Sequence, residues 1–230
     1  MFKRIRFAAT YAAVFAGASF NLACSRLPLP WVEVDEQLDQ ATCTLRIVED
    51  ANQATVTAEI SASGGRPVEL ADGQSLLVNG QPVAPADGAG AYGATIPIAD
   101  EYTVTVVEPS RGVTETTQAA PADFTITAPA PGGTVSLAGF TVTTSNSDPA
   151  LSASYRLAQS LFGVQEELVV PPAADTGSKS FAAQDLADFR QGADLSIIVT
   201  KISRRGDIAG FESSEITVER SRTVTAVPGP

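Results

Sequence analysis

Short runs in which apolar and polar residues alternate dominate this sequence, and they constrain its fold more than any other feature. In residues 55–62 the alternate positions are apolar, and residues 102–106 repeat the pattern with Tyr102, Val104 and Val106. Successive side chains of a β-strand point to opposite faces, so each run predicts a half-buried strand. Gly, Pro, Asn and Asp separate the runs, as expected for turns. The sequence therefore predicts an all-β protein of antiparallel strands.

One hairpin and several further strands can be placed along the chain. Asn79-Gly80 predicts a two-residue type I′ turn, and Pro82 places the following strand at a sheet edge. Residues 195–199 are apolar on both faces for part of their length, which predicts a central strand. A short helix is expected over residues 181–190, with Ser180 as its N-cap and Gly192 at its end. The other strands expected in the second half cover residues 124–127, 134–137, 140–144, 153–157, 167–170, 195–202 and 215–218.

The length of 230 residues allows one large or two small domains. Residues 116–123 lack alternation and contain Ala119, Ala120 and Pro121, so we place a boundary there. The expected organisation is a tether over residues 24–38, a first β-sandwich domain over 39–118 and a second over 122–228. The tether prediction rests on its prolines and acidic residues.

Residues 1–23 have the features of a secretory signal peptide. Lys3, Arg4 and Arg6 form a basic start, and an Ala-rich apolar stretch follows over residues 7–20. Polar residues interrupt that stretch before the length of about 20 apolar residues that a membrane-spanning helix needs. Removal of residues 1–23 leaves 12 basic against 26 acidic residues, a net charge of −14.

The end of the signal allows two processing routes. Leu22-Ala23-Cys24 resembles the lipobox of bacterial lipoproteins, although Asn21 stands where that family usually has Leu, Val or Ile. The resemblance implies lipidation of Cys24, and Ser25 after it favours the outer membrane. Alternatively, Ala16-Gly17-Ala18 is a site for ordinary signal peptidase, which would release a soluble chain beginning at Ser19.

The two cysteines connect this choice to the fold. If Cys24 is not lipidated, the expected pairing in an exported protein is a Cys24 to Cys43 disulfide. Lipidation of Cys24 would leave Cys43 unpaired. Cys43, Leu45 and Ile47 occupy every second position of their run, so we expect Cys43 on the inward face of a strand. A free thiol there behaves as a small apolar residue.

The amino-acid composition argues against several classes of function. The sequence contains no His, so the commonest general base and the commonest metal ligand are missing. A net charge of −11 and the lack of a basic stretch in the mature chain make nucleic acid an unsuitable partner. We expect no enzyme activity and no cofactor.

The candidate chemical motifs are weak. The acidic cluster Glu33, Asp35, Glu36 and Asp39 fits a solvated tether better than a metal site, because no calcium-loop pattern is present. The adjacent pairs Asp100-Glu101 and Glu166-Glu167 point to opposite faces of a strand, so neither forms an acid/base pair. The remaining motifs have ordinary structural explanations. Ser178-Lys179 fits a polar loop, the Gly-rich segment 88–93 a hairpin, and Arg205-Gly206-Asp207 a turn. The aromatic residues fit core positions; they are Trp31, Tyr92, Tyr102 and Tyr155.

The strand-and-turn pattern also resembles a known family. Residues 73–80, 92–98 and 101–106, together with Asp185-Leu186 and Gly192 leading into residues 195–201, are similar to immunoglobulin-like or fibronectin type III-like domains of bacterial surface proteins. The Cys, Trp and Cys spacing of antibody domains is absent. The resemblance implies noncatalytic sandwiches used for spacing or protein contact.

We therefore expect a noncatalytic lipoprotein of the cell envelope, facing the periplasm or the exterior. Its partners would be the membrane, through the lipid anchor, and an envelope protein. The alternative is a carbohydrate-binding module or adhesin that uses the loops 85–92 and 204–211 to hold a glycan or host surface.

Overall fold

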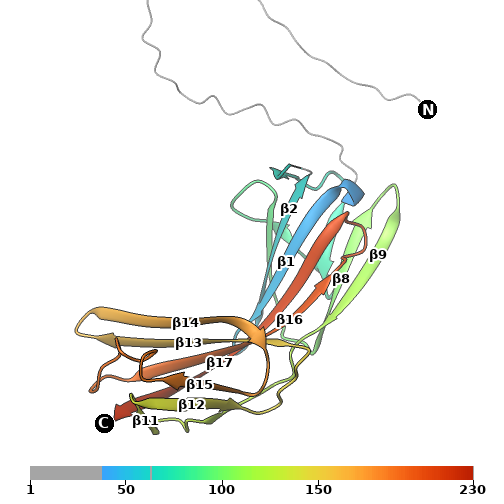
Figure 1. Cartoon of the computed structure of the whole chain (residues 1–230). Helices are drawn as coiled ribbons and strands as arrows, with labels where there is room; N and C mark the ends of the chain where they lie inside the picture. Colours follow the sequence, from blue (N-terminus) through green and yellow to red (C-terminus); the bar gives the residue numbers. More distant parts are fainter. Residues whose placement is uncertain (1–37, 63, 230) are drawn as a thin grey trace, which may run out of the picture. The chain divides into compact units, whose positions relative to one another are not determined.

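The computed structural model describes residues 38–62 and 64–229, and these form an all-β sandwich (Figure 1). The predicted signal peptide and nearly all of the predicted tether lie outside the described residues. Within the described part, the one helix is the three-residue 3-10 helix η1, Leu38–Gln40. No helix there is long and apolar enough to cross a membrane. The all-β sandwich fold predicted from the sequence is confirmed.

The strands belong to three sheets. The largest has ten strands in the order β14-β13-β16-β17-β1-β2-β7-β6, with β11 beside β17 and β3 beside β2. Its members are β1 (Ala41–Glu49), β2 (Ala54–Ala62), β3 (Arg66–Pro67), β6 (Ala84–Pro85), β7 (Ala91–Ile96), β11 (Thr134–Ser136), β13 (Ser152–Leu161), β14 (Val164–Ala174), β16 (Leu195–Gly206) and β17 (Ser213–Gly229). A four-stranded sheet contains β5 (Gln81–Pro82), β4 (Ser75–Val78), β8 (Glu101–Glu108) and β9 (Gly112–Ala119), and a three-stranded sheet contains β10 (Ile126–Ala128), β12 (Gly139–Thr144) and β15 (Ser178–Ala182).

Two apolar clusters lie between these sheets. The first joins β1, β2 and β7 of the large sheet to β4 and β8 of the four-stranded sheet. The second joins β13, β16 and β17 to β12 and β15. Each smaller sheet thus covers part of the large one, and alternate side chains of covered strands such as β1, β2 and β8 are buried.

The long hairpin β16–β17 contributes to both clusters. Its strands pair antiparallel from Leu195↔Ala226 to Gly206↔Glu215. At one end β13 pairs with residues 195–202 of β16, and at the other β1 pairs in parallel with residues 213–220 of β17. Val224 and Ala226 therefore belong to the second cluster, whereas Ile216 and Val218 belong to the first. Apart from this hairpin and Ile208 in its connecting loop, the first cluster lies before the predicted boundary at residues 116–123 and the second cluster lies after it.

The predicted local elements are largely present. Asn79 and Gly80 have φ of 49° and 74° and connect β4 to β5, which is an edge strand as Pro82 predicted. The run 195–199 lies in β16, between β13 and β17. The Gly-rich segment 88–93 forms part of the β6–β7 hairpin.

The helix predicted over residues 181–190 is wrong. Phe181 lies in β15, paired with Phe140, and its ring stacks on that of Phe140 at a centroid distance of 5.4 Å. Isolated turns follow, in which Asp185 N donates to Ala182 O and Phe189 N to Leu186 O. Leu186 and Phe189 are buried in the second cluster. Sheet pairing and burial of these aromatic side chains outweigh the helical preference of the segment.

Candidate functional site

Two buried ion pairs lie at the middle of the β16–β17 hairpin, and they form the most distinctive polar site of the described residues. Lys201 of β16 and Arg220 of β17 are direct cross-strand partners. Both side chains are buried, so each positive charge needs a compensating group. Asp175, just after β14, pairs with Lys201, and Glu49 at the end of β1 pairs with Arg220.

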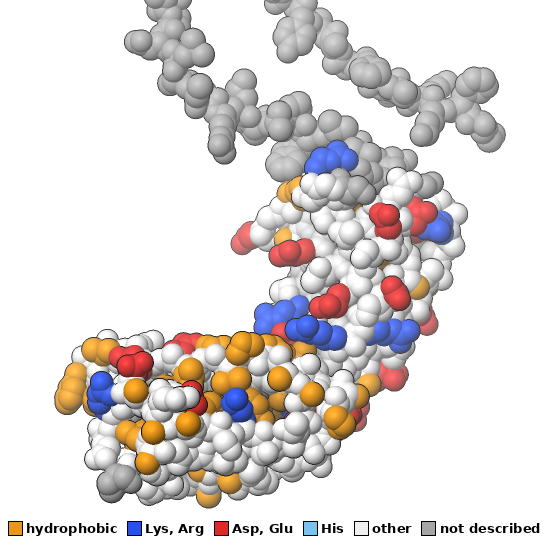
Figure 2. All heavy atoms as spheres, viewed as in Figure 1, with side chains coloured by type: hydrophobic (Ala, Val, Ile, Leu, Met, Phe, Trp, Pro, Cys, Tyr) orange, Lys and Arg blue, Asp and Glu red, His pale blue; other side chains and the backbone are white. Residues whose placement is uncertain are grey.

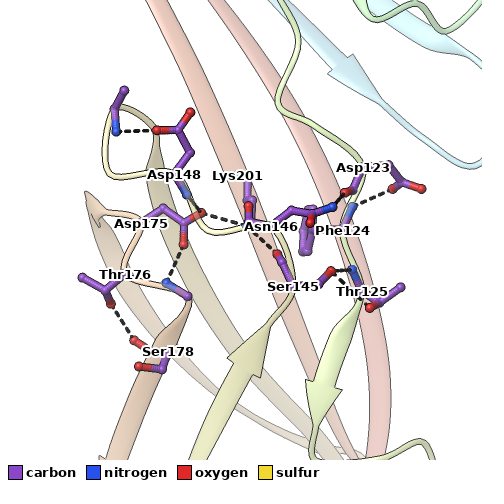
Figure 3. A network of polar contacts seen from close by, with 12 residues as sticks. Asp123, Phe124, Thr125, Ser145, Asn146, Asp148, Asp175, Thr176, Ser178 and Lys201 are labelled. Atoms are coloured by element: carbon purple, nitrogen blue, oxygen red, sulfur yellow. Dashed lines mark hydrogen bonds and ion pairs between the residues drawn. The ribbon is translucent and has the colours of Figure 1, made fainter.

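Lys201 is held on every side (Figure 3). Its Nζ lies 2.8 Å from Asp175 Oδ2 and donates to the backbone oxygens of Ser145 and Asn146 at 3.0 and 2.7 Å. The same nitrogen lies 4.8 Å from the centre of the Phe124 ring, a cation–π contact. The three donors of this ammonium group therefore all have oxygen partners.

Asp175 is as fully enclosed as Lys201, with no exposed side-chain surface. Its carboxylate accepts the backbone N–H groups of Gly177 at 2.9 Å and Asp148 at 3.2 Å. Burial raises the pKa of this carboxyl, but the hydrogen bonds from Lys201, Gly177 and Asp148 and the charge of Lys201 outweigh it. The pKa of Asp175 therefore lies below its ordinary value.

The second pair involves a tyrosine as well. Arg220 donates to both carboxylate oxygens of Glu49, and Tyr102 Oη donates to Glu49 Oε1 at 2.8 Å. Ala99 N donates in turn to Tyr102 Oη at 3.2 Å. The hydrogen bond to Glu49 raises the pKa of Arg220. Burial, first, and then the bond to Glu49 raise the pKa of Tyr102 above its ordinary value.

This network holds elements together and offers little for chemistry. Its charges are matched one to one, the three donors of Lys201 are occupied, and its side chains are buried. Buried, hydrogen-bonded pairs of this kind fix one arrangement of the elements that supply them. Lys201 was findable in the sequence, because it continues the inward positions Leu195, Ile197 and Val199. Its partner Asp175 carried no comparable signal.

Of the two cysteines, the structure describes Cys43 alone. Cys24, the predicted lipidation site, lies outside the described residues. Cys43 is buried on the same face of β1 as Leu45 and Ile47, as predicted, and it has no disulfide partner among the described residues. Burial raises the pKa of the Cys43 thiol to about 12.

The other sequence motifs are not brought together. Asp39 forms an ion pair with Arg111 at 3.0 Å, while Glu33, Asp35 and Glu36 lie outside the described residues. Asp100 and Glu101 are exposed, and Glu167 pairs with Arg156 at 2.9 Å. Across residues 38–62 and 64–229, no group of three or more Cys, Asp or Glu side chains could hold a metal ion.

The aromatic and loop candidates also have structural roles. Tyr92, Tyr102 and Tyr155 are buried, and Trp31 lies outside the described residues. In the loop 204–211, Arg205 donates to Thr117 O at 2.7 Å and Ala209 N to Thr116 Oγ1 at 2.9 Å, so this loop lies against β9. In the loop 85–92, Gly90 O accepts Ile60 N at 2.8 Å, which ties it to β2. Ser178 and Lys179 lie in β15, rather than in the predicted polar loop.

Comparisons with known proteins add a fold-level likeness. No protein family model and no curated protein matches the chain. Among solved structures, it is similar to an alpha-2-macroglobulin mutant from Salmonella, at 12% identity and a TM-score of 0.26. The match covers 86% of this chain and 15% of that one. The chain thus spans a small part of that protein's length, and the likeness carries no argument about function.

Proposed function

We propose that this protein is a noncatalytic lipoprotein of the cell envelope, anchored through Cys24, whose immunoglobulin-like sandwich acts as a structural or protein-interaction module. The observation that supports it most is the use of the buried charged groups. Lys201, Asp175, Arg220 and Glu49 neutralise one another inside the fold, so they serve its architecture. The signal-like residues 1–23 and the lipobox-like residues before Cys24 support export and anchoring.

The intact mass of the mature protein from a fractionated bacterial host tests the anchor. We expect a diacylglycerylated chain that begins at Cys24 and sediments with membranes. Cys24→Ser should abolish lipid labelling and release the protein, whereas the matched control Cys43→Ala should remain labelled. A soluble chain beginning at Ser19 and lighter by two hydrogens would contradict the proposal, because that mass corresponds to a Cys24 to Cys43 disulfide.

Purification from detergent-solubilised envelope tests the interaction role. We expect one envelope protein to co-purify in a fixed ratio with the lipidated chain. Recovery of no partner, together with hydrolysis of an envelope polymer by the purified chain, would contradict a noncatalytic role.

A further inference from the structure

The hairpin formed by β13 and β14 ends in a turn whose sequence does not suit its geometry. Phe162 and Gly163 connect Leu161 to Val164, with φ of 50° and 82°. The Asn79-Gly80 turn has nearly the same angles, 49° and 74°. Two-residue turns with positive φ at both positions favour Asn or Gly, whereas a bulky side chain at positive φ is strained.

The two turns use their first residue differently. Asn79 Oδ1 accepts the backbone N–H of Thr103 at 2.8 Å, so its side chain helps to build the sheet. Phe162 is 98% exposed and is the most exposed large apolar side chain of the described residues. Its ring adds strain and exposed apolar surface without contributing to either core. The fold buries almost none of the Phe162 ring, which is therefore available for contact with a partner.

The strand that follows Phe162 is an edge strand with unused pairing capacity. β14 pairs with β13 alone and ends the order of the ten-stranded sheet. Val164 and Val169 on it are each 58% exposed, and Figure 2 shows apolar side chains gathered on the face that β13 and β14 help to form. Pro171 and Pro172 lack N–H groups, so an added strand would pair along residues 164–170.

The charge beside this edge favours a basic partner. An open hollow of about 660 Å³ adjoins the turn and is lined by Phe162 and Leu161 together with Glu166, Glu167 and Asp194. Arg156 is the one basic residue of its lining, and Glu167 already pairs with it. The net charge of −14 that remains after removal of residues 1–23 disfavours an anionic lipid surface as the partner.

We propose that the β13–β14 hairpin is the partner-binding element of this protein. It takes an extended, basic segment of a protein as an additional strand beside residues 164–170, with the Phe162 ring packed against apolar side chains of that segment. Glu166 and Asp194 attract the basic side chains. This inference deepens the proposed interaction role and rests on it.

Defined peptides test this element on the folded chain. The probe is a nine-residue peptide that alternates Lys with Val and carries one Phe, and the control peptide has Glu in place of every Lys. We expect the basic probe to bind, its affinity to fall with added salt, and amide hydrogens of residues 164–170 to gain protection from exchange. Phe162→Asn should weaken binding at least tenfold, as loss of a central aromatic contact does.

Two matched variants sharpen the result. Val113→Asn removes another exposed apolar side chain, on edge strand β9 of a different sheet, and should leave binding unchanged. Phe162→Leu keeps an apolar side chain at the turn and should retain part of the affinity. Because Asn suits this turn, Phe162→Asn is expected to fold, and its melting curve verifies that directly.

Several outcomes would overturn the hairpin proposal. Two of them concern the peptides: the acidic peptide binds as well as the basic one, or Phe162→Asn binds the basic peptide as well as the wild type does. The other two point to a different partner: the chain binds phosphatidylglycerol vesicles in place of the peptide, or it self-associates, in either case in a way that depends on Phe162. If the hairpin proposal fails while Cys24 is lipidated and Phe162→Asn still retains an envelope partner, the proposed function stands and the contact lies elsewhere. Loss of lipidation and of every partner would instead remove the proposed function itself.

Discussion

At the scale of single residues, the pairing of Lys201 with Arg220 across the hairpin explains the two carboxylates around them. Like charges directly opposite each other on neighbouring strands are destabilising. Here Asp175 and Glu49 each neutralise one cation within the fold. The four groups together let two strands pass from one apolar cluster to the other without an unpaired charge.

Removing one member of the Lys201 pair should therefore be costly. Asp175→Asn leaves a buried, uncompensated ammonium group, and the free energy of unfolding should fall by about 3–5 kcal/mol. The double variant Asp175→Asn with Lys201→Met should lose less than the sum of the single changes. Urea denaturation measures both. The control is Arg156→Ala in the exposed pair with Glu167, which should cost less than about 1 kcal/mol. Equal losses for Asp175→Asn and this control would contradict the argument.

The same pair predicts a loss of stability in acid. Because the pKa of Asp175 is lowered in the folded state, its contribution is complete above the ordinary Asp value of about 3.9. That contribution is lost as the pH falls from there through the lower, folded-state pKa. Urea denaturation at pH 6, 4 and 3 should show a steeper fall for the wild type than for Asp175→Asn. Parallel pH dependence of the two chains would remove Asp175 as the cause.

Cys43 should be chemically inert while the protein is folded. Its thiol is 1% exposed and its pKa is raised to about 12, so almost no thiolate is present at neutral pH. In the Cys24→Ser variant, a thiol reagent should modify Cys43 only as fast as the chain opens. Reaction in native buffer at the rate seen in guanidinium chloride would contradict the burial described above.

At the scale of elements, the alternation of apolar residues was sufficient to locate strands but not their partners. Tyr102, Val104 and Val106 face the core as their spacing predicted. The parallel pairing of β1 with β17 joins residues about 170 positions apart, and no local pattern encodes that contact. Non-local contacts also explain the wrong helix, since Phe181 is fixed by Phe140 and by an edge contact with Tyr155.

In the candidate site, too, the local sequence pattern predicts which side chains face inward but not which groups they contact. An inward-facing Lys201 follows from the spacing of β16, and an inward Cys43 from that of β1. The identity of each partner depends on which loops the topology brings together. Asp175 is placed by the turn between β14 and β15, and Glu49 by the parallel pairing of β1 with β17.

The two hairpin turns supply a prediction about stability. Asn79→Ala removes the bond to Thr103 and places Ala at positive φ, so it should cost about 1–2 kcal/mol. Phe162→Asn relieves strain at a matching turn and should raise the free energy of unfolding by up to about 1 kcal/mol. Thermal unfolding of both variants measures this. Destabilisation by Phe162→Asn would show that the ring supports the hairpin after all.

At the scale of the whole molecule, the β16–β17 hairpin makes the two apolar clusters depend on the same strands. Ile216 and Val218 complete the first cluster, and Val224 and Ala226 the second. Residues 39–118 by themselves therefore lack core residues and β17, the parallel partner of β1, although they keep its antiparallel partner β2. An exposed β1 edge would also favour aggregation of such a fragment.

The described chain should accordingly unfold in one cooperative step. Calorimetry should give a single transition whose calorimetric and van't Hoff enthalpies agree. The fragment 39–118 should show no cooperative transition, because Ile208, Ile216 and Val218 are missing from its core. Residues 38–230 provide the control, since they contain all three. Two separate transitions, or a fragment 39–118 that melts cooperatively by itself, would show that the first sandwich is independent of the hairpin, as the sequence boundary at residues 116–123 predicted.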